Sequence, residues 1–205
     1  MRWLLYRVDS CGTLCCAGGM IRDARLPYLV TGMMILTTAI CLLAMGRVMI
    51  CPCGHIDLWG AVGSAEANMQ LADWYTPSHL LHGLLFYAGL WAVLPRLSVG
   101  WRLVLATALE CAWELVENTD AVIGYYRANT VSGDYIGDSV VNSLSDIAVM
   151  LLGFGLARVL PVWACVLLVV GFEILTALVI RDGLALNILM FVWPLDVVLE
   201  WQQAG

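Results

Sequence analysis

Seven carboxylate side chains lie between Glu110 and Asp146, in a stretch whose single basic residue is Arg127. Glu110, Glu114 and Glu117 are spaced at i, i+4 and i+7, which places them on one face of a helix. Carboxylates crowded in this way cannot all be ionised together, so either some bind protons or a cation neutralises them. The spacing therefore predicts a site for a cation or for protons.

Two further predicted helices carry polar side chains that can join this face. Asp138, Asn142 and Asp146 lie at i, i+4 and i+8, and His79 and His82 lie at i and i+3. Imidazole and carboxylate groups together are typical ligands of zinc, manganese and iron. We expect a divalent metal bound by His79, His82, Glu114, Glu117 and Asp138. The catalytic candidates of the same cluster are Glu110, Glu114, Glu117, Asp138, Asn142 and Asp146.

The spacing of these residues matches no familiar metal motif. Neither His-Glu-x-x-His nor the Glu-x-x-His repeat of di-iron bundles occurs in the chain. Carboxylate chains also carry protons or ions through transporters, so metal binding and proton use both stay open. Single polar groups on membrane helices commonly bond a neighbouring helix, and this is our interpretation of Glu173, Asn187 and Asp196.

The composition indicates an integral membrane protein. Of the 205 residues, 61% are hydrophobic and 13% are charged, against about 45–50% and about 25% in soluble domains. The net charge of −6 argues against a nucleic-acid binder, which needs a basic face. The lipid bilayer is therefore the expected partner, nucleic acid is not, and protein partners are not specified.

The apolar stretches predict an all-α fold, with about six transmembrane helices in one bundle. A helix needs about 20 apolar residues to cross the hydrocarbon core. Pro77, Pro95, Gly100, Pro161 and Asp182-Gly183 separate the stretches. The expected spans are 27–50, 77–94, 101–117, 138–160, 162–180 and 184–201, within one transmembrane domain, 27–205.

The arginines predict the orientation, because basic residues favour the cytoplasmic side. Arg47, Arg127 and Arg181 lie on one side of the predicted spans, and the other seven arginines lie on the opposite side. We therefore expect a multi-pass protein of the bacterial inner membrane with both termini in the cytoplasm. The loops at about 51–76 and 118–137 would face the periplasm, as would the polar cluster. Residues 1–26 would form a loosely ordered cytoplasmic tail.

The first of these loops holds two smaller features. A short interfacial helix is expected over 64–74, with Trp74 at the level of the lipid headgroups. Cys51, Cys53 and His55 could bind a metal or carry a redox pair in the oxidising periplasm. Cys-x-Cys is a weak signal, so a structural or incidental role is the preferred interpretation.

Three motifs resemble those of a bacterial membrane family, Uncharacterised Protein Family 0314 (domain of unknown function 2585). They are DWYTPSHLLHG at 73–83, ECAWELVENTD at 110–120 and GDYIGDSVVNSLSD at 133–146. The resemblance covers 27–201 and implies a multi-pass inner-membrane protein, with no reaction attached. A weaker pattern is similar to VanZ-like proteins, at the positions of His82, Glu110 or Glu114, and Asp138 with Asn142.

Three hypotheses of function follow from the cluster. The first is metal-assisted hydrolysis or transfer on a lipid or lipid-linked envelope substrate, with one carboxylate as general base. The second is transport of protons or metal ions, which requires polar groups that continue to the cytoplasmic side. The third is a non-catalytic assembly factor for a larger membrane complex.

Overall fold

The computed structural model describes residues 17–61, 64 and 66–204, so residues 1–16 of the predicted tail lie outside the described part. Within these ranges the chain forms helices and no β-strand, which confirms the all-α prediction. The elements are α1 (Ala17–Ala44), a 3-10 turn η1 (Ala67–Met69), α2 (Thr76–Val93), α3 (Val99–Glu117), α4 (Asp120–Asn129), α5 (Val140–Val159), α6 (Val162–Val179), α7 (Leu184–Val192) and α8 (Asp196–Gln203).

In the described part of the chain, three helices are long and apolar enough to cross a membrane, judged by length and composition. They are α1 over Arg25–Ala44, α5 over Val140–Val159 and α6 over Val162–Val179. A membrane environment also fits the surface of α6, where Trp163, Leu167 and Leu178 are more than 60% exposed. Helices α2 and α3 are of similar length, 18 and 19 residues, and carry the His and Glu side chains of the predicted cluster.

Capping residues set the starts of several helices. The side chains of Ser98, Thr119 and Ser139 accept hydrogen bonds from backbone N–H groups in the first turns of α3, α4 and α5. Pro161 directly precedes α6 and separates it from α5. The predicted bounds of α2, α3, α5 and α6 are therefore correct to within two residues.

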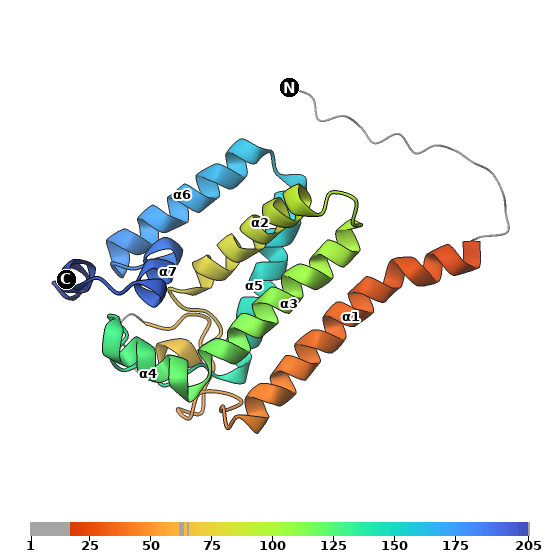
Figure 1. The fold of residues 1–205 in the computed structure, drawn as a ribbon. Helices are drawn as coiled ribbons and strands as arrows, with labels where there is room; N and C mark the ends of the chain where they lie inside the picture. Colours follow the sequence, from red (N-terminus) through yellow and green to blue (C-terminus); the bar gives the residue numbers. More distant parts are fainter. Residues whose placement is uncertain (1–16, 62–63, 65, 205) are drawn as a thin grey trace.

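The predicted last span, 184–201, is wrong as a single helix. Pro194 lies between α7 and α8, and proline drives the preceding residue out of the helical conformation. Trp193 accordingly has φ −147° and ψ 87°. At about 1.5 Å per residue, α7 reaches roughly 14 Å, half of the hydrocarbon core of roughly 30 Å. Helices α7 and α8 lie at the same end of the bundle as α4, opposite the start of α1 (Figure 1).

The predicted helix over 64–74 is also wrong, because among the residues described in this range only the three of η1 are helical. Apart from the short-range bonds of η1, the backbone pairs with an earlier part of the loop. The N–H of Leu71 donates to the carbonyl of Asp57 at 3.0 Å, and the N–H of Gly60 donates to that of Ala72 at 2.7 Å. Groups bonded in this way are not free for the i to i−4 bonds of a helix.

The second predicted loop, 118–137, contains a helix that the sequence analysis did not foresee. Thr119 caps α4, Asp120 lies in its first turn and Arg127 in its last turn, and these charges complement the helix dipole. Arg47, just after α1, donates to the carbonyl of Ile136 at 3.0 Å and lies 3.4 Å from Asp120. The loop is thereby tied to the end of α1.

Helix α2 crosses α5 at two glycines, with α1 packed along α3 beside them (Figure 1). A Cβ on Gly83 would collide with the backbone of α5 at Met150, and a Cβ on Gly153 would collide with the carbonyl of Leu80. His79 lies one turn before Gly83, and Asp146 lies two turns before Gly153. The crossing therefore sets the distance between the polar faces of the two helices.

Candidate metal centre

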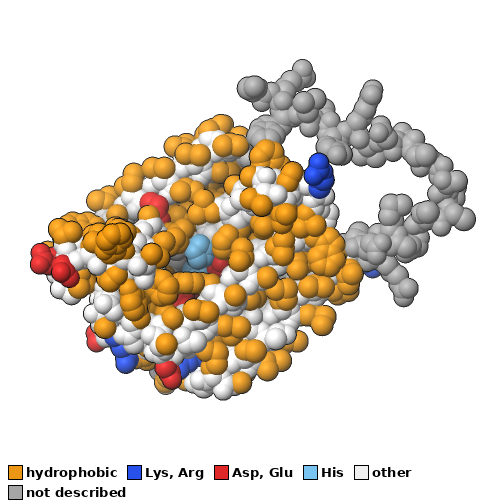
Figure 2. Space-filling view, viewed as in Figure 1, with side chains coloured by type: hydrophobic (Ala, Val, Ile, Leu, Met, Phe, Trp, Pro, Cys, Tyr) orange, Lys and Arg blue, Asp and Glu red, His pale blue; other side chains and the backbone are white. Residues whose placement is uncertain are grey.

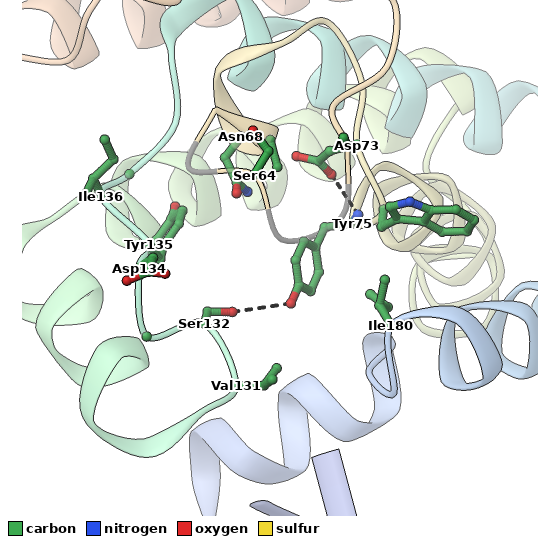
Figure 3. A pocket seen from close by; sticks show the side chains of 15 residues that line it. Ser64, Asn68, Asp73, Tyr75, Val131, Ser132, Asp134, Tyr135, Ile136 and Ile180 are labelled. Atoms are coloured by element: carbon green, nitrogen blue, oxygen red, sulfur yellow. Dashed lines mark hydrogen bonds between the residues drawn. The ribbon is translucent and has the colours of Figure 1, made fainter. Parts of the chain in front are cut away.

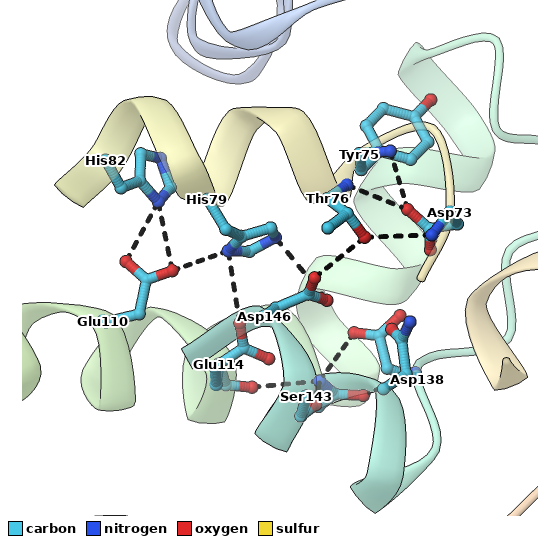
Figure 4. A network of polar contacts seen from close by, with 12 residues as sticks. Asp73, Tyr75, Thr76, His79, His82, Glu110, Glu114, Asp138, Ser143 and Asp146 are labelled. Atoms are coloured by element: carbon cyan, nitrogen blue, oxygen red, sulfur yellow. Dashed lines mark hydrogen bonds and ion pairs between the residues drawn. The ribbon is translucent and has the colours of Figure 1, made fainter. Parts of the chain in front are cut away.

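His79 of α2 is the centre of the polar cluster, and it is 6% exposed. Its Nδ1 lies 2.6 Å from Oε1 of Glu110 and 3.6 Å from Oε1 of Glu114, both on α3. Its Nε2 lies 3.8 Å from Oδ2 of Asp146 on α5. Figure 4 shows the imidazole between the three carboxylates. One histidine thus joins three helices.

Glu110 connects the two histidines. Its carboxylate is fully buried, and its Oε2 lies 3.0 Å from Nδ1 of His82, one turn along α2. The ring of His82 stacks on that of Phe86, with the centroids 5.4 Å apart. A carboxylate that bonds one ring nitrogen fixes the orientation of the imidazole and directs the other nitrogen elsewhere. Glu110 therefore directs Nε2 of His79 toward Asp146.

Within the polar cluster, two groups of side chains are spaced so that they could hold a metal ion. In the first group His79 is joined by Glu114 and Asp146, and in the second by His82 and Glu110. Within each group the ligand atoms lie within 4.8 Å of one another. The first group is entirely buried. It offers one imidazole nitrogen and two carboxylate oxygens, a set that suits zinc or manganese.

Glu114 is the least satisfied member of the first group. Its side chain is 1% exposed, and its buried Oε1 accepts no hydrogen bond from any residue that the structure describes. A buried carboxylate oxygen without a bonding partner is costly. Glu110, Glu114 and Asp146 together also outnumber the two imidazoles, so the cluster requires protons or a cation for neutrality.

Asp146 is held in place by a turn at the start of α2, which the spacing of the cluster residues did not predict. The hydroxyl of Thr76 donates to Oδ1 of Asp146 at 3.1 Å and accepts from the N–H of Asp73 at 2.9 Å. Oδ1 of Asp73 in turn accepts from the N–H groups of Tyr75 and Thr76 at 2.7 and 3.1 Å. This reciprocal pair is a capping-box arrangement, and the Asp-x-x-Thr spacing was its signal in the sequence.

Asp138 lies next to the cluster but outside both metal groups. Its Oδ2 accepts from the amide of Asn118 and from the hydroxyl of Tyr135, each at 2.9 Å. Its N–H donates to Oδ1 of Asn118 at 2.8 Å. Burial raises the pKa of Asp138 to about 6, and the charge of Asp73 adds to this effect. The geometry thus gives Asp138 a bonding role between α3 and the start of α5.

Glu117 and Asn142, the remaining predicted residues, line the space beside the cluster. Both border a small cavity of about 30 Å³ with His79 and Asp146. Glu117 is half-buried and, like Asp138, belongs to neither metal group. The amide of Asn142 donates to the carbonyl of Gln70 at 2.9 Å and holds the loop over the site.

The isolated polar groups have different roles. Glu173 accepts hydrogen bonds from the N–H groups of Leu184 and Ala185 at 3.0 and 3.1 Å, which caps α7. Asn187 accepts from the hydroxyl of Tyr126 at 3.1 Å. Both bond neighbouring helices, as predicted. Asp196 does not fit that prediction, because it is exposed at the start of α8.

Cys51 and Cys53 form a disulfide, so neither offers a thiolate to a metal in this state. The nearby His55 faces Asp57 instead, with Nε2 and Oδ2 3.2 Å apart and both side chains exposed. The disulfide and the His55–Asp57 contact both lie within the loop after α1, so neither is part of the cluster around His79.

Comparisons with known proteins agree with the resemblance in the sequence motifs. The model of a family described as "Protein of unknown function (DUF2585)" matches residues 42–204. A UPF0314 protein of Paracoccus denitrificans is 59% identical over 179 residues, which cover 87% of this chain and 93% of the relative. A UPF0314 protein of Rhizobium meliloti is 52% identical, over 77% of this chain and 81% of the relative. One of Novosphingobium aromaticivorans is 49% identical, over 83% of this chain and 89% of the relative. No solved structure matches the chain significantly. The chain therefore belongs to the UPF0314 (DUF2585) family.

Proposed function

We propose that this protein binds a divalent metal ion between His79, Glu114 and Asp146 and uses it on a lipid or lipid-linked envelope substrate. The reaction class is metal-assisted hydrolysis or group transfer. The observation that carries the proposal is the buried group of three ligand atoms within 4.8 Å of one another. A cation there would neutralise the carboxylates and polarise a carbonyl or phosphoryl oxygen.

The surrounding residues support this assignment of roles. Glu110 lies 2.6 Å from His79 and so acts as the orienting carboxylate that metal-bound histidines usually have. Glu117 borders two of the cavities that reach His79, which makes it the candidate general base. His82 belongs to the second group and would complete a second, weaker site.

We further propose that the protein lies in the bacterial inner membrane with the cluster toward the periplasm. The helix bounds place Arg96 and Arg158 at the end of the bundle where α1 begins, and Arg47, Arg127 and Arg181 at the other end. Basic residues favour the cytoplasm, so the start of α1 is assigned there. With α7 and α8 in place of a sixth span, α8 lies at the end of the bundle that holds α4 (Figure 1). We therefore replace the expected cytoplasmic C-terminus with a periplasmic one.

The first experiment measures bound metal. The full chain is purified in mild detergent without chelator, and its metal content is measured by elemental mass spectrometry. We expect close to one equivalent in the wild type and in His55→Ala, which removes an exposed loop histidine. His79→Ala should lose the metal, while His82→Ala should retain most of it.

A folded wild type that contains no metal and takes up neither zinc nor manganese would contradict the proposal. The cluster would then be a network of protonated carboxylates. Proton flux into liposomes would test the transport alternative in that case, and unchanged function in cluster variants would favour assembly. If the metal is present, lipid and lipid-linked substrates are tested with Glu117→Gln, which should lower turnover without lowering metal content.

A further inference from the structure

Three neighbouring cavities lie at or beside the cluster, and the side chains in their walls differ. A cavity of about 240 Å³ lies among the loops (Figure 3), with Asn68, Ser132 and Asp134 in a wall that also holds apolar side chains; we call it the polar cavity after its polar groups. An apolar groove of about 260 Å³ lies between α2, α3 and α7, with Leu109 and Ile188 in its wall. The cavity of about 30 Å³ already described lies between them.

Shared residues show that the three spaces are neighbours. Tyr75 borders all three cavities, and Tyr135 borders the polar and the small one. His79 and Glu117 border the small cavity and the apolar groove. A molecule that extends from the polar cavity to the groove would therefore pass the candidate metal centre.

The apolar groove opens on a hydrophobic face of the molecule. Figure 2 shows a histidine in a hollow on a face otherwise covered largely by hydrophobic side chains. Leu109 on one wall is 50% exposed, and Ile188 on the other is 54% exposed. A groove lined in this way is complementary to a hydrocarbon chain. Its volume is below the roughly 300–1,000 Å³ of pockets that hold drug-sized ligands, so it suits one chain segment.

The polar cavity selects against a negatively charged head group. Its lining includes the carboxylates of Asp73 and Asp134 and the hydroxyls of Ser132 and Tyr75, and it includes no Lys or Arg among the described residues. The hydroxyls of Tyr75 and Ser132 are hydrogen-bonded to each other at 3.3 Å in its wall. Carboxylate and hydroxyl groups bind hydroxyl groups of a ligand well, whereas carboxylates repel a bare phosphate.

We propose that the protein binds an amphiphile with one acyl chain in the groove and a neutral, hydroxyl-bearing head group in the polar cavity. The junction between chain and head then lies beside His79 and Glu117. The assignment of this molecule as a substrate rests on the proposed function, whereas the binding itself does not.

Photolabelling tests the binding. The full chain in phosphatidylcholine nanodiscs is treated with chelator and exposed to a monoacylglycerol with a diazirine in its chain, and labelled peptides are mapped by mass spectrometry. We expect the label to concentrate in α3 and α7, around Leu109 and Ile188. Leu109→Trp fills the groove and should lower labelling at least fivefold. Leu105→Trp adds the same bulk one turn away, outside the groove lining, and should leave it unchanged.

A matched probe tests the head group. A lysophosphatidate with the same diazirine chain should label the groove several-fold less in the chelated protein. Equal labelling by the two probes would overturn the assignment of the polar cavity. Label spread evenly over α1 and α6, with no effect of Leu109→Trp, would overturn the groove. Thermal unfolding of each variant checks that it is folded. Because metal is absent, these results are independent of the metal content that tests the proposed function.

Discussion

The Nδ1 atom of His79 lies 2.6 Å from Oε1 of Glu110, so the imidazole is held by a carboxylate that belongs to the next helix. If Glu110 orients a metal ligand, its replacement should weaken metal binding without abolishing it. Loss of such an outer carboxylate typically costs about 10–100-fold in affinity. We expect a decrease of this size for Glu110→Gln, measured by competition with a fluorescent zinc chelator. Glu200 is exposed on α8, so the control variant Glu200→Gln should bind metal with the wild-type affinity. If Glu110→Gln also binds with the wild-type affinity, Glu110 does not orient a metal ligand.

The hydroxyl of Thr76 is expected to stabilise the site through its two hydrogen bonds. Thr76→Val would leave the N–H of Asp73 and Oδ1 of Asp146 without this partner, at a cost of about 1–3 kcal/mol. Thr76→Ser retains the hydroxyl and should remain close to the wild type. Thermal unfolding in detergent compares the three proteins. Equal destabilisation by valine and serine would assign the effect to packing of the methyl group instead.

The glycine crossing of α2 and α5 predicts a large difference between two alanine variants of one helix. Gly153→Ala places a methyl group against the carbonyl of Leu80, whereas Gly155→Ala meets no atom within 4 Å. The first should be destabilised by at least the roughly 1–3 kcal/mol typical of overpacked cores. The second should be neutral or slightly stabilised, because alanine favours helices. The unfolding temperatures of the two variants are measured side by side. Equal values would contradict the close crossing of α2 and α5.

Asp182, in the turn between α6 and α7, predicts a pH dependence of stability. Burial raises its pKa to about 6, despite hydrogen bonds from Gly183 and Tyr75. The folded state therefore binds this proton more tightly than the unfolded state, so the stability from this group falls as pH rises from about 4 to about 6. The expected change is about 2–3 kcal/mol. The difference in unfolding temperature between wild type and Asp182→Asn should follow this trend, and a difference that is constant with pH would contradict it.

The disulfide between Cys51 and Cys53 tests the proposed orientation. Disulfides persist in the periplasm and are reduced in the cytosol. In protein taken from cells with thiols blocked at lysis, we expect the peptide with both cysteines to be lighter by two hydrogen atoms. Free thiols in that peptide would place the loop in the cytoplasm. Buried Cys111, which is not in a disulfide, is the internal control for incomplete blocking.

The parts of the fold that could be predicted depend on local signals. Pro77 and Pro161 begin α2 and α6 within a residue, because proline fits the first turn of a helix. Pro27, the predicted start of the first span, lies inside α1 instead, which begins at Ala17. Pro194 was an equally local signal of a helix end, but the apolar residues on both sides of it favoured the prediction of one continuous span over 184–201. Thr119, Asp120 and Arg127 were the local signals of helix α4. They lie in a stretch too polar for a membrane span, so a search for spans did not find them.

The candidate site was predictable as far as helical periodicity reaches. The spacing of Glu110 and Glu114, and of His79 and His82, correctly placed each pair on one face, and the faces meet. The separation of Asp138 from the metal groups was not predictable. It depends on Asn118, which is 20 residues away, and on a loop path that no periodic pattern encodes. For the same reason, the helical spacing of 64–74 could not predict the backbone bonds that Leu71 and Ala72 make with Asp57 and Gly60.

The glycine contact between α2 and α5 makes the two sides of the candidate metal centre unequal in stiffness. Backbone against backbone at Gly83 and Gly153 leaves no side chain there that could change rotamer, so we expect the separation of His79 and Asp146 to be fixed. The opposite wall is the nine-residue α7, held by the Glu173 cap and the bond of Asn187 to Tyr126. Any widening of the apolar groove for a larger ligand would therefore fall on α7, the shorter and less closely packed wall, and would leave the geometry around His79 unchanged.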